Sequence, residues 1–280
     1  MNTQQFKELR SWFTSYVKQY LVGEGGVREI EVRDAMVLKT QHTGRVCAEI
    51  LALGSDLALP PHELVIAKVI ALLHDVGRFE QFKRYGTFAD RHSVNHAEMG
   101  VTIIKGQRVL DSLSPNEQDL ILDSVRFHNR AQLPQNASAT CLFFTKLLRD
   151  ADKLDIWRVV TAYYASQTGK RNGAIELDLP DTPGYTRAVG EDLMAGRIVD
   201  VNQMRNCNDF KLAQAGWVYD VNFGPTFQRV HERNYLGKIR RALPRDDGID
   251  AMFETITAYL ERQRMDRQDK GKRKTPPRGE

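Results

Sequence analysis

Apolar residues recur every three or four positions along most of the chain, and this spacing constrains the fold more than any other feature of the sequence. Near the N-terminus, Phe6, Leu9 and Phe13 fall on one face of a predicted helix. The glycines at positions 23, 25 and 26 are predicted to end this helix. Residues 29–54 repeat the pattern. A chain built from such segments buries its apolar surface by packing helix against helix.

The segment that begins at Pro60 and Pro61 is mostly apolar and predicts a buried helix that ends at Gly77. Further helices are predicted at about 93–106, 115–128, 139–165, 185–196, 226–242 and 248–264. Only the short segment IELDLP at 175–180 resembles a strand. We therefore predict an all-α fold, a helical bundle with a C-terminal helical extension.

Three regions are predicted along the chain. Residues 1–184 form a helical core that includes the N-terminal helix, 185–264 form a C-terminal helical extension packed on that core, and 265–280 form a basic, disordered tail. Within the core, the segment 166–184 is rich in Gly, Pro and charged residues, which is typical of a surface connection or a lid.

The charge of the chain is concentrated at its C-terminal end. Residues 262–280 carry a net charge of +5, whereas the whole chain carries +4, so the remainder is close to neutral. A nearly neutral body does not indicate nucleic acid as the main partner. No apolar run is long enough to span a membrane and the N-terminus lacks the apolar region of a signal peptide, so we expect a cytoplasmic protein without a membrane partner.

The cysteines Cys47, Cys141 and Cys207 are odd in number, lie far apart and form no CxxC motif. We expect them to be reduced and mostly buried as small apolar residues.

The residues that indicate chemistry are four histidines and two aspartates placed in or beside predicted helices. They are His42, His74, Asp75, His96, His128 and Asp152. His74 and Asp75 follow the apolar run Val65–Leu73, where both side chains have to leave water. Buried charged groups are retained mainly when they are paired or bind a metal.

Asp152 lies beside the apolar stripe of the predicted 139–165 helix, which favours a ligand role, whereas Asp150 and Asp155 flank it and are expected to be supporting or structural. His92 lies four residues before His96, a spacing that can chelate one ion, but it stands in a polar segment outside the helix. His62 and His231 have surface-like surroundings.

Four imidazoles and two carboxylates favour Fe, Mn, Co or Zn over Mg or Ca. The absence of a cysteine ligand argues against a structural zinc site. Six protein ligands exceed what one catalytic ion accepts while keeping open positions. We therefore predict two divalent ions per chain with Asp75 as the bridge, the ions being Fe, Mn or Co, with Zn possible.

The order His42, His74–Asp75, Asp152 resembles the H…HD…D signature of the HD-domain superfamily of metal-dependent phosphohydrolases, over about residues 30–165. His96 and His128 resemble the additional histidines of the members that hold two metals. The resemblance implies a helical bundle with the metal site at its centre.

Known branches of the superfamily fit less well. Hydrolases of the alarmone (p)ppGpp carry Glu-Asp where this chain has Arg78 and Phe79. Cyclic di-GMP phosphodiesterases of the HD-GYP type have a Gly-Tyr-Pro motif after paired histidines, whereas here His128 is followed by Asn129 and Arg130. The signatures of the deoxynucleotide triphosphohydrolases are also missing.

The resemblance implies a metal-dependent phosphohydrolase that acts on a nucleotide or another small phosphoester through a metal-activated water. Asp75, Arg78 and Lys153 are the expected catalytic residues. Arg78 and Lys153 are expected to face the phosphate and neutralise its charge. Two alternatives stay open, namely an HD-type di-iron oxygenase with the same ligands and a non-catalytic module that senses a nucleotide. The sequence does not indicate the substrate or the oligomeric state.

Overall fold

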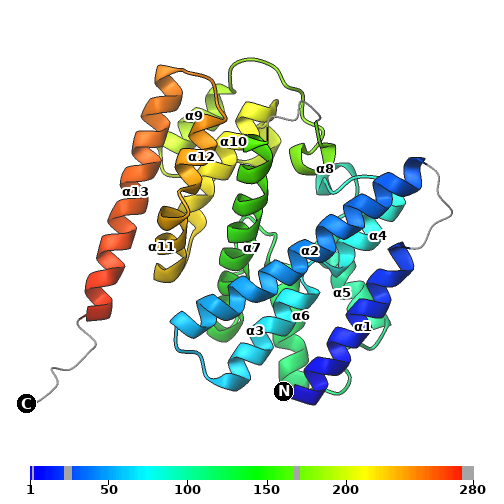
Figure 1. Cartoon of the computed structure of the whole chain (residues 1–280). Helices are drawn as coiled ribbons and strands as arrows, with labels where there is room; N and C mark the ends of the chain where they lie inside the picture. Colours follow the sequence, from blue (N-terminus) through cyan, green and yellow to red (C-terminus); the bar gives the residue numbers. More distant parts are fainter. Residues whose placement is uncertain (2, 22–26, 167–170, 273–280) are drawn as a thin grey trace, which may run out of the picture. The chain divides into compact units, whose positions relative to one another are not determined.

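Helices provide all the regular secondary structure in the part of the chain described by this computed structural model, residues 1, 3–21, 27–166 and 171–272 (Figure 1). The all-α prediction is therefore confirmed. The α-helices are α1 (Thr3–Leu21), α2 (Val27–Asp56), α3 (Pro61–Leu73), α4 (Val76–Tyr85), α5 (His96–Gly106), α6 (Pro115–Phe127), α7 (Ala139–Ala165), α8 (Gly173–Glu176), α9 (Arg187–Met194), α10 (Cys207–Gly216), α11 (Gly224–Glu232), α12 (Tyr235–Arg241) and α13 (Asp247–Lys272). Three short 3₁₀ helices are η1 (Asp90–His92), η2 (Val201–Gln203) and η3 (Trp217–Asp220).

The chain divides into two compact units, Met1–Asp155 and Ile156–Glu280, with the division inside α7. The boundaries expected at 184 and 264 stay predictions. Helix α13 continues to Lys272, and the part of the expected tail from 273 onward lies outside the described residues.

The first unit is built around α3, which packs against α2. Pro61 starts α3 at a position where its missing N–H costs nothing, and the helix then buries almost every side chain from Ile66 to Leu73. Burying one such aliphatic side chain contributes about 1.5–3 kcal/mol. A helix buried on all sides is a rigid base for the residues that directly follow it.

The predicted end of this helix at Gly77 is wrong. Helix α3 ends at Leu73, and a new helix, α4, begins at Val76 and contains Gly77. Gly77 is required by a close approach of α4 and α5, because a Cβ there would lie 2.1 Å from the carbonyl oxygen of His96. The glycine is therefore a packing contact between helices rather than a helix stop.

The second unit packs around fully buried aromatic side chains such as Trp157 and Phe227. The single helix expected at 226–242 is instead two helices, α11 and α12, because Asn234 adopts a left-handed conformation with φ +50°. The segment 175–180 is not a strand, since it includes the end of α8 and since Leu177 and Asp178 have positive φ, which extended backbone excludes.

Among the described residues, no helix is long and apolar enough to cross a membrane. Cys47, Cys141 and Cys207 are unpaired and buried, which confirms the prediction from their spacing.

Candidate metal centre

His74 and Asp75 occupy the turn between α3 and α4. Successive residues of one continuous helix point about 100° apart, so two neighbours cannot easily share one site. Here the helix breaks, because Asp75 leaves the helical region with φ −104° and ψ 15° before α4 starts. The break turns both side chains toward the same centre, where His74 Nε2 lies 3.6 Å from Asp75 Oδ2.

A first group of potential ligands comprises three residues from different elements. They are His42 from α2, His74 directly after α3 and Asp152 from α7. His42 Nε2 lies 3.1 Å and His74 Nε2 3.8 Å from Asp152 Oδ1. Both histidines are buried, and Asp152 keeps a side-chain exposure of 20%. We call this set group one.

A second group comprises Asp75, His96 at the first position of α5 and His128 directly after α6. The Nε2 atoms of His96 and His128 lie 3.1 Å apart, and all three side chains are buried. We call this set group two. Together the groups contain all six predicted ligands.

Asp75 connects the groups because its two oxygens face different histidines. Oδ2 lies 3.6 Å from the Nε2 atoms of both His42 and His74, whereas Oδ1 lies 3.5 Å from that of His96 and 4.0 Å from that of His128. A carboxylate with this arrangement is suited to bridge two ions, as in two-metal sites.

The four histidines share one orientation toward their surroundings. Each Nδ1 atom faces an oxygen that can only accept, so each Nδ1 carries a proton, and whenever the ring is neutral its Nε2 presents the lone pair to the centre. The acceptors are Asp155 for His42, the Ala71 carbonyl for His74, Asp90 for His96 and the Val125 carbonyl for His128, at 2.7–2.9 Å. Histidine ligands of metals are commonly held in this way.

Unsatisfied buried atoms test whether these residues fit a metal. Among the described residues, His42 Nε2, His74 Nε2 and Asp152 Oδ1 are buried without a hydrogen-bond partner. The facing lone pairs of His96 and His128 repel each other unless a cation lies between them. Buried polar atoms are rarely left unsatisfied, so the donor set fits divalent cations.

The pKa values of the four histidines shift in two directions, and the shifts do not follow the division into group one and group two. Burial lowers the pKa of His74 and of His96, and it lowers the pKa of His128 to about 3, so these rings stay neutral. Burial also opposes protonation of His42, but Asp152 and Asp155 outweigh it and raise its pKa.

Burial alone raises the pKa of Asp75, yet electrostatic interactions, led by that with the Lys39 ammonium and including that with the Arg78 guanidinium, bring that pKa well below its usual range. The carboxylate is therefore ionised at neutral pH and available as a ligand.

Two cations approach the centre. Arg78, which the sequence predicted, lies with Nε 3.5 Å from Asp75 Oδ1, and its Nη1 donates to Gln81, Phe88 and Asp90. Lys39 was missed as a functional residue, although its Nζ lies 2.8 Å from Asp75 Oδ2. It precedes His42 by one helical turn, and this spacing was the available signal.

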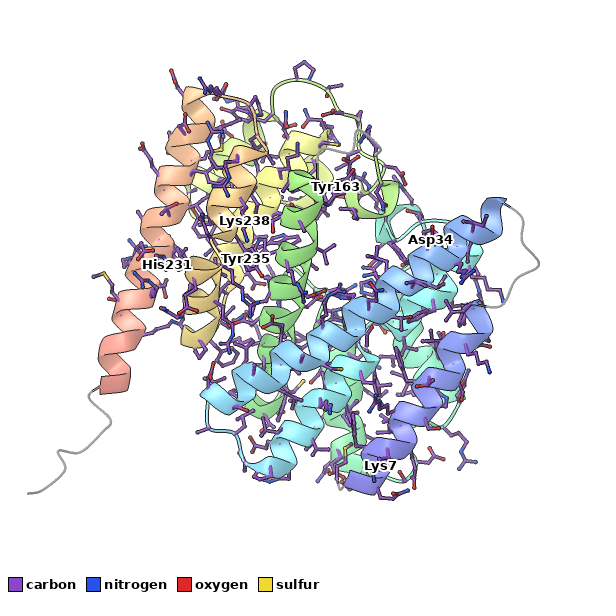
Figure 2. All side chains as sticks on the ribbon, in the orientation of Figure 1. Lys7, Asp34, Tyr163, His231, Tyr235 and Lys238 are labelled. Atoms are coloured by element: carbon purple, nitrogen blue, oxygen red, sulfur yellow. The ribbon has the colours of Figure 1, made fainter. Side chains whose placement is uncertain are left out.

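The other predicted residues have separate surroundings. Lys153 is half-buried beside Asp152, and its catalytic role stays a prediction. Asp155 supports His42, as expected for a supporting residue. Neither metal group includes His92 or His62, and His62 has an exposed side chain. His231, which is labelled in Figure 2, pairs with Glu261 of α13 in the second unit.

Asp90 is a functional candidate that the sequence did not reveal. It stands in the polar segment ADRHS, where no periodicity indicates that its carboxylate faces inward. In the structure it accepts hydrogen bonds from His96, Arg78, Gln81 and Asn129.

Comparison with known families gives one match, to the HD domain, over residues 40–157. The matched segment contains all six residues of groups one and two. Comparisons with curated proteins and with solved structures give no match.

Proposed function

From the premise that residues 40–157 form an HD domain, a family made mostly of metal-dependent hydrolases, we propose that this protein hydrolyses phosphoester bonds in a nucleotide or another small phosphorylated molecule. The observation that carries the proposal is the position of Asp75 between two groups of buried ligands, with Lys39 and Arg78 beside it.

Groups one and two would each hold one divalent ion, with Asp75 shared between them. Bound ions of this kind lower the pKa of a coordinated water to about 7 and offset the negative charge of a phosphate. The chain's own contribution is to keep four Nε2 lone pairs and two ionised carboxylates aimed at one small volume. The Nδ1 partners fix the ring orientations before any ligand arrives.

The charges near the centre favour an anionic substrate. Two carboxylates that support the histidines are neutralised by arginines. Asp90 forms an ion pair with Arg78, and Asp155 forms one with Arg45. Lys39 adds a further cation, with its Nζ 5.2 Å from the Phe88 ring centroid. With two divalent ions bound, the centre has a positive excess, which attracts and orients a phosphate.

Asp152 is the most exposed of the six ligands, so we infer that the substrate approaches group one from the side of this residue. His96 and His128 are buried, which keeps bulk water away from group two. Lys39, partly exposed and one helical turn from His42, is placed to bind the phosphate as it enters.

The test begins with protein purified without oxygen and without chelators, whose metal content per chain is measured. The same protein is assayed for phosphate release from aryl phosphates, phosphodiesters and nucleotides, and for oxygen uptake. We expect about two Fe, Mn or Co ions per chain and metal-dependent hydrolysis. Asp75→Ala removes metal and activity together, whereas the matched control Asp111→Asn, an exposed aspartate paired with Arg108, changes neither.

Full hydrolysis by the Asp75→Ala protein contradicts the proposal. Oxygen uptake with substrate oxidation and no phosphate release supports the di-iron oxygenase instead. Two bound metals with neither activity, but with nucleotide binding, support the sensing module.

A further inference from the structure

The segment between α4 and α5, residues 86–95, supplies Asp90, which orients the His96 ring of group two. We call this segment the Asp90 loop. Asp90 Oδ2 accepts a hydrogen bond from His96 Nδ1 at 2.8 Å and one from Asn129 at 3.1 Å. Its Oδ1 accepts from Arg78 at 2.9 Å and from Gln81 at 2.8 Å. The loop therefore orients a ligand that lies outside it.

Gln81 fastens the Asp90 loop to α4. Its side chain is completely buried, and its Nε2 lies within hydrogen-bond distance of Asp90 Oδ1, Ser93 Oγ and the Val94 carbonyl. Its Oε1 accepts from Arg78, whose Nη1 also donates to the Phe88 carbonyl. A buried amide with these contacts fixes the loop without touching any ligand atom of group two.

Group one has a different support. Its carboxylate, Asp155, is part of α7, has only 1% exposure and accepts two hydrogen bonds from Arg45. The carboxylate that supports group two lies in η1 and keeps a side-chain exposure of 31%. Group one is therefore oriented by helices alone, whereas group two depends on a loop. Loops open locally at a lower free energy than packed helices.

We propose that the Asp90 loop separately sets the affinity of group two for its divalent ion. Asp90 and Gln81 are positioning residues in this arrangement. Group one fills first and firmly, and group two gains or loses its ion as the loop closes or opens. The inference rests on the proposed function in taking both groups as metal sites, but it concerns binding and not turnover.

Metal-free protein titrated with Co²⁺ under anaerobic conditions provides the test, with binding followed by calorimetry and by the visible spectrum of the bound ion. Two steps, each near one ion per chain, are expected. Asp90→Asn keeps the size of the side chain but removes its charge, and it weakens the second step by about 10–100-fold while the first is unchanged. Asp155→Asn, the counterpart on α7, weakens the first step.

Gln81→Leu is a second variant, because it releases the loop and leaves His96 and Asp90 in place. It weakens the second step in the same direction as Asp90→Asn. Asp111→Asn serves as the control without effect on either step. Thermal unfolding of each metal-free variant shows whether it is folded, and any unfolded variant is replaced by the other loop variant.

Equal weakening of both steps by Asp90→Asn overturns the proposal, as does weakening of the first step alone or no change in either. These readings involve no substrate. Two-step Co²⁺ binding with the expected variant effects supports the loop's role even if no phosphoester is hydrolysed, and hydrolysis with unaltered metal binding in Asp90→Asn contradicts the loop's role alone.

Discussion

Gly77→Ala is the substitution whose effect the structure determines most directly. A Cβ at this position lies 2.1 Å from the His96 carbonyl oxygen and 2.7 Å from the Gly100 nitrogen. Both obstructing atoms are backbone, so no side chain can rotate away. To restore a contact of about 3.0 Å, α4 and α5 have to separate by roughly 0.9 Å, which a close-packed interior resists.

Overpacking of this kind costs about 1–3 kcal/mol, and the rigid backbone contacts place Gly77→Ala near the upper value. Alanine regains about 1 kcal/mol through its higher helix propensity. The expected net loss is about 2 kcal/mol, or roughly 4–8 °C in Tm for a unit of this size. Because the shifted carbonyl belongs to His96, the substitution also weakens metal binding by group two.

The assay is thermal and urea unfolding of the metal-free protein, followed by Co²⁺ titration. Gly44→Ala is the matched control, because a Cβ there meets nothing within 4 Å and the helix gains about 0.5–1 kcal/mol. A Gly77→Ala protein that unfolds at the wild-type temperature and binds two ions with unchanged affinity refutes the reasoning about the contact between α4 and α5.

Three further predictions concern the centre and the core. Lys39→Gln raises the KM for a phosphoester by about tenfold or more, since a hydrogen bond to a charged group contributes about 1.5–3 kcal/mol, and metal content measured in parallel stays at the wild-type value. Loading with Co²⁺ at 100 times its Kd raises the unfolding free energy by about 2.7 kcal/mol per site, and an unchanged Tm argues against binding to the folded state. Burial raises the pKa of the Cys47 thiol from 9.0 to about 12, so its stabilising contribution is complete below pH 9 and is lost as the pH rises toward 12, and Cys47→Ala reduces this alkaline loss in urea unfolding.

The regular helices could be predicted because their signals are local. The spacing of apolar residues predicts 139–165, and α7 is Ala139–Ala165. The breaks were harder, because they depend on neighbours distant in sequence. From the sequence alone, Gly77 predicts a helix end. In the structure it lies inside α4, where the backbone of α5 approaches too closely for a Cβ. Asn234 divides the 226–242 segment through one backbone angle, which hydrophobic periodicity does not encode.

The two groups of potential ligands contain the six residues that their types, and the burial implied by their helices, predicted. Their division into two groups could not be predicted, because it depends on which oxygen of Asp75 faces which histidine. The supporting residues divide in the same way. Asp155 follows Asp152 on α7, and a supporting role was expected for it; it contacts His42 Nδ1. Asp90 could not be identified from the sequence, because its contact with His96 depends on the conformation of the loop.

The histidines of the two groups have the same kinds of hydrogen-bond partner, although these partners come from different parts of the sequence. Each group contains one histidine supported by a carboxylate and one supported by a carbonyl three residues earlier on its own helix, Ala71 for His74 and Val125 for His128. A carbonyl partner comes with the helix end itself, so His74 and His128 need no additional residue. A carboxylate partner has to be delivered by another element, and it makes the imidazole a stronger donor. The difference between α7 and the Asp90 loop as the source of that carboxylate is therefore where the two groups can acquire different affinities.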